Sequence, residues 1–202
     1  AVYSAAFRQA GVLQLDTLED VLDTAALMAR APGATPGGLT ILTNGGGAGV
    51  LAVDALEHVG GQLTELSSAT QNTLRAIVPA HAACGNPVDI LGDAGPDLYA
   101  RSLAALLAAP EVEAVLAVNC PTAVADSTLA ADAVVAATLA QASRKPVFGA
   151  WIGEVSVAEG RRKLTAAGLP AYTTPEEAVR AFARLGQSAT LRARVSDIPD
   201  GP

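Results

Sequence analysis

The sequence has few aromatic residues, few cysteines and few positive charges. Aromatic residues make up 3% of the 202 residues, so an apolar core has to be built from Ala, Val and Leu. The two cysteines, Cys84 and Cys120, cannot form the multi-bridge framework of a small secreted protein. A net charge of −7 argues against a nucleic-acid partner, which would require a basic face.

Long apolar runs and targeting signals are also lacking. No stretch reaches the roughly 18 uncharged apolar residues of a membrane-spanning helix, and nothing resembles a signal peptide. We therefore expect a cytoplasmic protein with no membrane partner. The chain begins at Ala1 with a helical pattern already under way and no Met, so we interpret it as a piece of a longer polypeptide. Its hydrophobic fraction of 50% is enough for a sizeable core.

The most informative stretch runs from residue 39 to residue 60. Residues 39–43 are apolar and rich in β-forming types, residues 44–49 read Asn-Gly-Gly-Gly-Ala-Gly, and residues 50–60 have the spacing of an amphipathic helix. This order predicts a strand, a glycine loop and a helix. The helix is expected to turn Val50, Val53 and Leu56 toward the core.

The start of this helix has the properties of an anion site. The first-turn amides of a helix have no intrahelical partner, and the helix dipole adds partial positive charge there. Glycines let the backbone approach a phosphate with no Cβ in the way. We therefore expect a phosphoryl group or another anion at Asn44, Gly45, Gly46, Gly47, Ala48 and Gly49.

The glycine loop alone leaves three interpretations open. A Walker A phosphate loop is excluded, because no Lys-Ser or Lys-Thr follows the glycines. A dinucleotide-binding fingerprint is partly matched by Gly47, Gly49 and Ala52, with Glu65 roughly 20 residues on, where a ribose-binding acid is expected. The loop could instead hold a phosphoryl group, or it could be a turn that only permits tight packing.

Strands and helices alternate along most of the chain. This pattern predicts an α/β fold, a flavodoxin- or Rossmann-like three-layer sandwich with a mostly parallel sheet of about five strands. The strands are expected at residues 39–43, 62–66, 112–118, 146–151 and 171–173. After Gly186 the apolar period fades, so we expect one domain over residues 1–186 and a tail or linker over residues 187–202.

Ligands of such sheets bind outside the carboxyl ends of the strands. The loops at residues 44–49, 119–124 and 151–154 all leave these ends, so we expect them to form one rim. Before the first core strand we expect a short strand at residues 12–15 and a helix with Leu18, Val21 and Leu22 facing inward. Either Asp16 with Glu19 or Thr17 with Asp20 could open that helix as a capping box.

Several motifs together resemble a known family. They are Thr-Asn-Gly-Gly-Gly-Ala-Gly-Val at 43–50, Asn-Pro-Val-Asp at 86–89, Lys-Pro-Val with a Gly-Glu exit at 145–154, Gly-Leu-Pro at 168–170 and Thr-Pro-Glu at 174–176. In this order they resemble the NDP-forming acyl-CoA synthetases, relatives of succinyl-CoA synthetase, across about residues 1–185. Within that family the chain is similar to one flavodoxin-like ligase-CoA domain, equivalent to the carboxyl-terminal domain of the succinyl-CoA synthetase β subunit.

The resemblance implies a ligase that joins a carboxylic acid and CoA using ATP, reversibly, through an acyl phosphate and a phosphohistidine. It implies that the helix after residues 45–49 points its amino end at the phosphohistidine, and that Thr122, Ala123 and Val124 lie near the substrates. Pro121 and Thr122 stand where relatives often have glycines. ATP or ADP, Mg²⁺ and CoA would be bound by other domains. The implied partners are a CoA-binding, a second flavodoxin-like and an ATP-grasp domain, in the same protein or a partner subunit, and a homo-oligomer stays open.

Histidine is the main departure from the family. Its phosphorylated histidine lies in a Ser-His-Thr-Gly motif, which this sequence lacks and which we expect before Ala1. No catalytic residue is therefore expected in this chain, and the isolated chain should be inactive. His58 is expected on a solvated helix face, whereas His81 with Cys84 could be either a loop or a nucleophile pair.

Three other residues also allow a structural and a functional interpretation. Asp89 and Asp93 could be turn caps or metal ligands, and the turn role is the commoner one, so no metal site is expected. Cys120 on the rim is expected to be a small buried residue rather than a nucleophile. Two rival functions also stay open: an acyl-CoA or nucleotide sensor fused to a protein acetyltransferase, and an independent NAD-binding domain. Sequence outside residues 1–202 would separate the first rival from the ligase.

Overall fold

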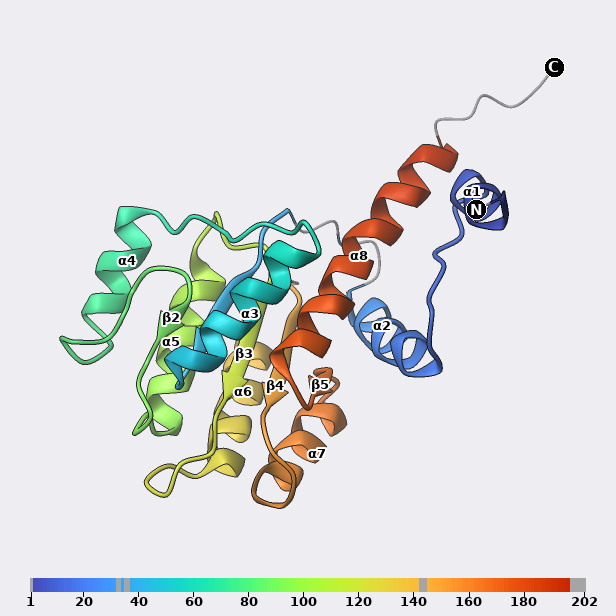
Figure 1. Ribbon diagram of the computed structural model, residues 1–202. Helices are drawn as coiled ribbons and strands as arrows, with labels where there is room; N and C mark the ends of the chain where they lie inside the picture. Colours follow the sequence, from blue (N-terminus) through green and yellow to red (C-terminus); the bar gives the residue numbers. More distant parts are fainter. Residues whose placement is uncertain (1, 32–33, 35–36, 142–144, 197–202) are drawn as a thin grey trace.

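A parallel five-stranded sheet forms the centre of the molecule (Figure 1). The computed structural model describes residues 2–31, 34, 37–141 and 145–196. The strand order is β2-β1-β3-β4-β5. The strands are β1 (Thr40–Thr43), β2 (Val88–Asp89), β3 (Val115–Asn119), β4 (Val147–Trp151) and β5 (Ala171–Tyr172). The predicted α/β class is confirmed.

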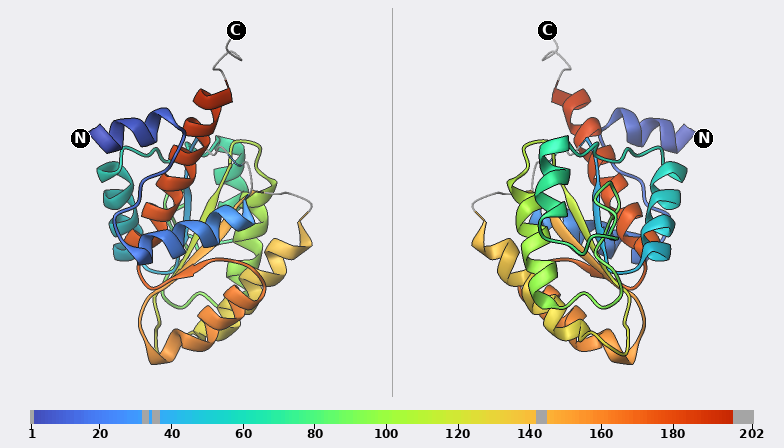
Figure 2. Two further views of the ribbon diagram at one scale, coloured as in Figure 1. Left: turned by 90° about the vertical axis from the view of Figure 1, so that its right-hand side faces the viewer. Right: turned by 90° about the vertical axis from the view of Figure 1, so that its left-hand side faces the viewer.

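Helices cover both faces of the sheet and complete three layers (Figures 1 and 2). One face carries α3 (Gly46–His58) and α8 (Pro175–Ser196), with α2 (Leu18–Arg30) packed on α8. The other carries α4 (Ser68–Arg75), α5 (Pro96–Ala108), α6 (Ser127–Ala140) and α7 (Ala158–Ala166). Along β3, Val115 and Ala117 join one core, and Leu116 and Val118 join the other. A sheet buried on both faces explains why its strands are apolar throughout.

The second strand of the sheet is not the predicted one. Residues 62–66 form no strand, and only Leu63 pairs with Leu39, just before β1 begins. The position next to β1 is taken by β2, where Val88 aligns with Leu42. The side chain of Asn86 bonds backbone groups at the edge of β1. Its Oδ1 accepts from Ile41 N at 2.9 Å, and its Nδ2 donates to Leu39 O at 2.8 Å.

The amino-terminal segment matches the prediction at two helices and differs at one strand. Helix α1 (Val2–Gln9) ends before Gly11, whose φ of 71° lies in the left-handed region that glycine favours. Residues 12–15 form no strand and are not part of the five-stranded sheet. Of the two capping alternatives, Thr17 caps α2, and its Oγ1 accepts from Asp20 N at 3.1 Å.

The buried face of α2 is opposite to the predicted one. Leu18, Val21 and Leu22 are exposed, whereas Thr24 and Leu27 are buried. Asp20 lies one turn before Thr24 and forms an ion pair with Arg184 of α8 at 2.6 Å. This polar contact, together with Leu27, fixes the face that α2 turns to the body.

Helix α3 begins earlier than predicted. Gly46 to Gly49 are helical, so the connection from β1 consists of Asn44 and Gly45 alone. The buried residues of α3 are Ala48, Gly49, Ala52 and Leu56, so the expectation was correct for Leu56 and wrong for Val50, which is exposed. Small residues allow α3 to lie close to the sheet and α8.

The amino end of α4 is held by an acid from a distant part of the chain. Ser67 is the N-cap, and its Oγ accepts from Thr70 N at 3.2 Å. Glu111 Oε1 accepts from Ser67 N at 2.9 Å and from the Thr70 hydroxyl at 2.7 Å. These bonds lower the pKa of Glu111 to about 2, with the Thr70 hydroxyl as the largest cause.

The last helix is longer than predicted. Helix α8 continues through Gly186 to Ser196, and Ser188, Ala189 and Leu191 are buried. The expected tail is therefore helical at least to Ser196, because its small and apolar residues still contact the rest of the protein. The division of the chain at residue 186 stays a prediction. Among the residues that the structure describes, every helix is too short or too polar to span a bilayer.

Candidate functional site

The loops that leave the carboxyl ends of β1 to β4 meet at one edge of the sheet. The Thr122 hydroxyl donates to Gly92 O at 2.9 Å, which joins the loops after β3 and β2. Ile152 N donates to Asn119 O at 2.9 Å, which joins β4 to β3. The three rim loops expected from the sequence are therefore neighbours, and the loop after β2 is a fourth member.

The amino end of α3 opens onto this edge. Its N-cap, Gly45, is extended and supplies no side-chain cap. Gly46 and Gly47 are exposed, and a Cβ added at Gly47 would meet no atom within 4 Å. Gly49 N is already bonded to Gly45 O at 3.1 Å. The amides available to a ligand are therefore those of residues 46–48, in the first turn of the helix.

Asn44 connects two of the rim loops. It is 2% exposed, its Nδ2 donates to Cys120 O at 2.9 Å, and its Oδ1 accepts from Cys120 N at 2.7 Å. Thr43 supports the same turn, because its Oγ1 accepts from Gly45 N at 3.0 Å. Since the Asn44 side chain is occupied within the protein, we interpret this residue as positioning the glycine turn rather than contacting a ligand.

Asp89 lies beside the start of α3. Its Oδ1 accepts from Leu91 N at 2.9 Å, which is the turn-cap role weighed in the sequence. Its Oδ2 lies 2.8 Å from where a Cβ on Gly46 would be. A carboxylate at this position interacts favourably with the positive end of the helix dipole, but it repels an incoming anion. Leu91 has a φ of 73°, an uncommon backbone conformation for a residue other than glycine, and such conformations gather at functional sites.

A buried polar layer supports the edge from below. The Tyr99 hydroxyl donates to Val118 O at 2.9 Å and accepts from Asn119 Nδ2 at 3.2 Å. Burial is the main cause that raises the pKa of Tyr99, so this hydroxyl stays protonated. Trp151 is also fully buried, and its Nε1 donates to Ser127 O at 2.9 Å, so it is a core residue. No local pattern in the sequence predicts the Tyr99–Asn119 contact, which joins α5 to β3.

The two cysteines are not arranged as nucleophiles. Burial, and then the charge of Asp89, raises the pKa of the Cys120 thiol, so the thiolate is disfavoured. Cys84 is buried, whereas His81 and His58 are exposed. The structure shows no hydrogen bond between His81 and Cys84, although it describes both residues. The loop interpretation of His81 is therefore the better one.

The predicted substrate loop lies on the rim. Thr122 is partly buried by its bond to Gly92, while Ala123 and Val124 are exposed. Nothing in this geometry assigns them a ligand, so their role stays a prediction. Within the described part of the chain, no three His, Cys, Asp or Glu side chains gather in a way that could hold a metal ion, and Asp93 is exposed.

The NAD interpretation lacks the strand on which it depends. Its acid should follow the strand that neighbours β1, at the same edge as the glycine turn. That neighbour is β2, whereas Glu65 follows the single bridge of Leu63 at the other end of β1. Glu65 is therefore not placed to hydrogen-bond the ribose of a dinucleotide bound at Gly47.

Comparison with known protein families tests the resemblance found in the sequence. The model of the ligase-CoA domain family matches residues 39–195, which is most of the chain. The chain belongs to the ligase-CoA domain family. The matched region of this ligase-CoA domain begins one residue before β1, so α1 and α2 lie outside it.

Relatives of this ligase-CoA domain are ADP-forming CoA ligases. The chain is 38% identical, over 95% of its length, to acetate–CoA ligase (ADP-forming) I of Archaeoglobus fulgidus, of which it covers 27%. It is 33% identical, over 96% of its length, to subunit alpha of acetate–CoA ligase (ADP-forming) I of Pyrococcus furiosus, of which it covers 42%. Acetyl-coenzyme A synthetase 1 of Candidatus Korarchaeum cryptofilum, in complex with phosphate and ADP, superposes on all of this chain at 32% identity with a TM-score of 0.92.

The ligase-CoA domain is only part of such proteins. The chain spans less than half of each of these relatives, including 43% of the Korarchaeum chain. The resemblance to NDP-forming acyl-CoA synthetases is therefore confirmed at the level of the family, and the relatives contain further domains or subunits.

Proposed function

We propose that this chain is one domain of a multidomain NDP-forming acyl-CoA synthetase. The whole enzyme would join a carboxylic acid and CoA using ATP, reversibly, through an acyl phosphate and a phosphohistidine. The ADP-forming ligases among the relatives support this activity. The chain covers only 27% and 42% of two of them, which supports a reaction shared among several domains. In this proposal, other domains bind the nucleotide with Mg²⁺ and CoA, and the enzyme is cytoplasmic.

The role of this chain would be to dock the phosphorylated histidine at the amino end of α3. The observation that carries the proposal is the exposed, uncapped first turn of α3, with open space at Gly47. Amides in this position donate to phosphoryl oxygens, and the helix dipole stabilises their charge. Asn44 would contribute by holding the turn in place through Cys120.

The surroundings of this turn favour an anion that is delivered by a neighbouring domain. Asp89 lies beside Gly46, and the chain carries a net charge of −7, so a free anion is repelled as it approaches. A phosphoryl group on an attached domain has a high effective concentration, which offsets that repulsion. We therefore expect free phosphate to bind weakly.

The test removes one amide of the turn and keeps its shape. Gly46→Pro deletes the N–H at the first helical position, where proline is tolerated, and the extended Gly45 suits the residue before a proline. Gly46→Ala is the matched control, because it meets Asp89 in the same way but keeps the N–H. In an NMR titration with inorganic phosphate, Gly46→Pro should bind about tenfold more weakly than Gly46→Ala.

Three outcomes would contradict the proposal. The first is equal phosphate affinity in the two variants, and the second is phosphate-induced shifts that do not involve residues 46–48. The third is turnover of ATP with CoA and an acid by the isolated chain, because the proposal places those sites in other domains.

A further inference from the structure

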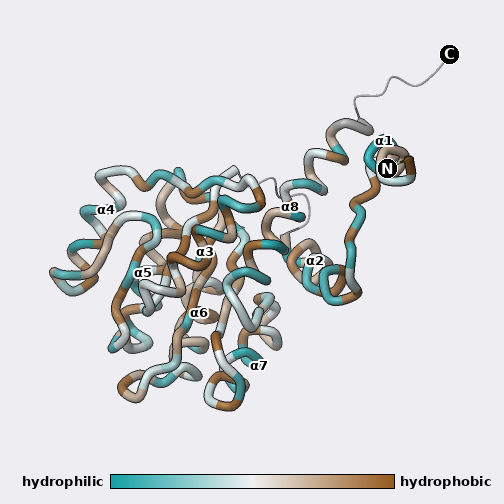
Figure 3. Tube along the Cα trace, viewed as in Figure 1, coloured by the Kyte–Doolittle hydropathy of each residue, from teal (hydrophilic) through white to brown (hydrophobic). Residues whose placement is uncertain are grey.

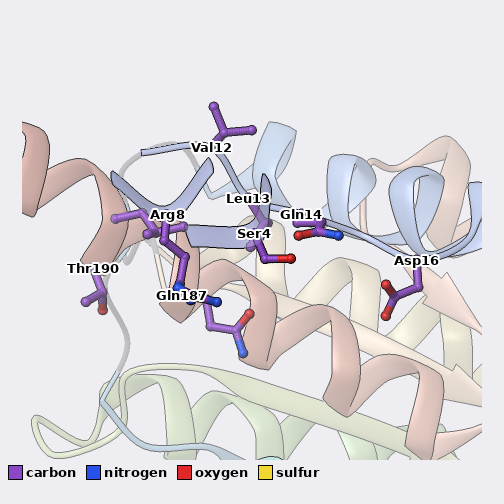
Figure 4. A pocket seen from close by; sticks show the side chains of 9 residues that line it. Ser4, Arg8, Val12, Leu13, Gln14, Asp16, Gln187 and Thr190 are labelled. Carbon is purple, nitrogen blue, oxygen red and sulfur yellow. The ribbon is translucent and has the colours of Figure 1, made fainter. Parts of the chain in front are cut away.

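Helix α1 turns its polar side to the body of the protein and its apolar side outward. Ser4 and Arg8, one turn apart, line a cavity of about 570 Å³ together with Gln187 and Thr190 of α8 (Figure 4). Tyr3 and Phe7, also one turn apart, do not line this cavity, and Tyr3 is 81% exposed. No residue of α1 is buried. An amphipathic helix normally does the opposite, because apolar side chains stabilise a fold only when they leave water.

Helix α2 shows the same inversion. Its contact with α8 is made by the face that holds Asp20 and Leu27, whereas Leu18 and Leu22 share the outer face. Leu22 is 63% exposed. Figure 3 shows hydrophobic residues along both helices, which stand at the edge of the molecule beyond α8. Exposed apolar clusters of this kind mark contact surfaces rather than ordinary solvent-facing residues.

We infer that α1 and α2 form a docking surface for a neighbouring domain of the same gene product. That domain covers the exposed apolar side chains of the two helices, which are Val2, Tyr3, Phe7, Leu18, Val21 and Leu22. This inference rests on the proposal that the chain is one domain of a larger ligase. The occupant is a folded domain that presents an apolar face, and its contacts remove these side chains from water.

The comparisons favour a neighbouring domain over a second copy of this chain. The ligase-CoA domain match begins at Leu39, after both helices. The relatives nevertheless align over 95% and 96% of the chain, and the Korarchaeum structure superposes on all of it, so a counterpart of α1 and α2 exists outside the matched domain. Those relatives are also more than twice as long as the chain, so they contain the additional protein that can cover the two helices.

Hydrogen exchange tests the inference in the whole gene product and in the 202-residue chain. Amides of α1 and α2 should exchange at least about tenfold more slowly in the whole gene product, because docking suppresses local opening. Leu22→Ser should abolish that difference, since it removes an apolar contact with the neighbour. Leu139→Ser on α6 is the matched control, because Leu139 is 69% exposed and lies outside the proposed surface, and it should leave the difference intact.

Several results would overturn the inference. Equal exchange of α1 and α2 in the two proteins would do so, and so would a gene product that consists of these 202 residues alone. A concentration-dependent dimer of the 202-residue chain that Leu22→Ser dissociates would assign the surface to a second copy instead. Phosphate binding at Gly46 is measured separately in the same samples. If phosphate does not bind at Gly46 but α1 and α2 still exchange more slowly in the whole gene product, only the phosphohistidine role is rejected and the docking surface stands.

Discussion

Asn44 and Cys120 form a closed pair of hydrogen bonds between the ends of β1 and β3. The Asn44 Nδ2 donates to Cys120 O at 2.9 Å, and Cys120 N donates to Asn44 Oδ1 at 2.7 Å. One side chain therefore satisfies both backbone groups of the residue that follows a separate strand. The pair fixes the glycine turn relative to the loop of residues 119–124.

Asn44→Ala should lower the free energy of unfolding by about 2 kcal/mol, because the partly buried N–H and C=O groups of Cys120 lose their hydrogen-bond partner. It should also weaken phosphate binding, although the Asn44 side chain is not expected to touch the ligand. Urea denaturation and a phosphate titration measure the two effects. Asn72→Ala is the control, since the exposed side chain of Asn72 accepts from Arg75 on the helix surface, and it should cost less than about 0.5 kcal/mol. Unchanged phosphate affinity in Asn44→Ala would contradict the positioning role.

Asp89→Asn should strengthen phosphate binding by about threefold to tenfold, because it removes a negative charge beside Gly46. The amide oxygen can still accept from Leu91 N, so the loop should keep its conformation. The gain should shrink at high salt, where charges are screened. Isothermal titration at two salt concentrations checks this. Weaker binding in Asp89→Asn would instead assign the carboxylate a direct role in ligand contact.

Asp20→Asn should destabilise the attachment of α2 to α8 by about 2 kcal/mol, because it leaves the Arg184 charge in a mostly buried position. The hydrogen bond from Arg184 is the largest cause that lowers the pKa of Asp20. The stabilisation is therefore present above the ordinary pKa of an Asp and is lost as the pH falls through the lowered value. Denaturation curves recorded against pH measure it. Asp97→Asn, in the exposed pair with Arg101, should have almost no effect.

Glu111→Gln should destabilise the protein at neutral pH and lose its effect in acid. The folded state holds the pKa of Glu111 at about 2, against an ordinary value of 4.5. The ionised carboxylate therefore stabilises the fold above pH 4.5, and this contribution disappears as the pH falls toward 2. Urea denaturation of both proteins between about pH 7 and about pH 2.5 measures the difference. A pH-independent difference would show that the Thr70 and Ser67 contacts do not depend on charge.

Local patterns were sufficient for the elements that carry their own signals. The apolar run of β3 and the glycine-started helix α3 have the predicted type. The cap of α6 is a local signal of the same kind, since Asp126 accepts from Thr128 N and Leu129 N. The rim of loops followed from the rule that parallel strands share a carboxyl edge. These predictions depend on short-range periodicity and on capping, so a single sequence contains the information they need.

Features that depend on distant partners were missed. Residues 62–66 look like a strand, but Asn86 satisfies the edge of β1 and β2 takes the neighbouring position. The prediction of the inward face of α2 was wrong, because amphipathicity identifies an apolar face without indicating which part of the protein covers it. Asp89 was weighed as a metal ligand or a turn cap, and only the fold shows that it lies beside Gly46.

Helix α8 packs against α2 on one side and against α3 on another. The Tyr172 hydroxyl, from β5 just before α8, adds a bond to Asp23 O of α2 at 3.0 Å. One helix therefore connects α2 to the helix that starts at Gly46. Because α8 contacts both of them, the placement of α2 and that of the proposed phosphate-binding turn depend on the same element.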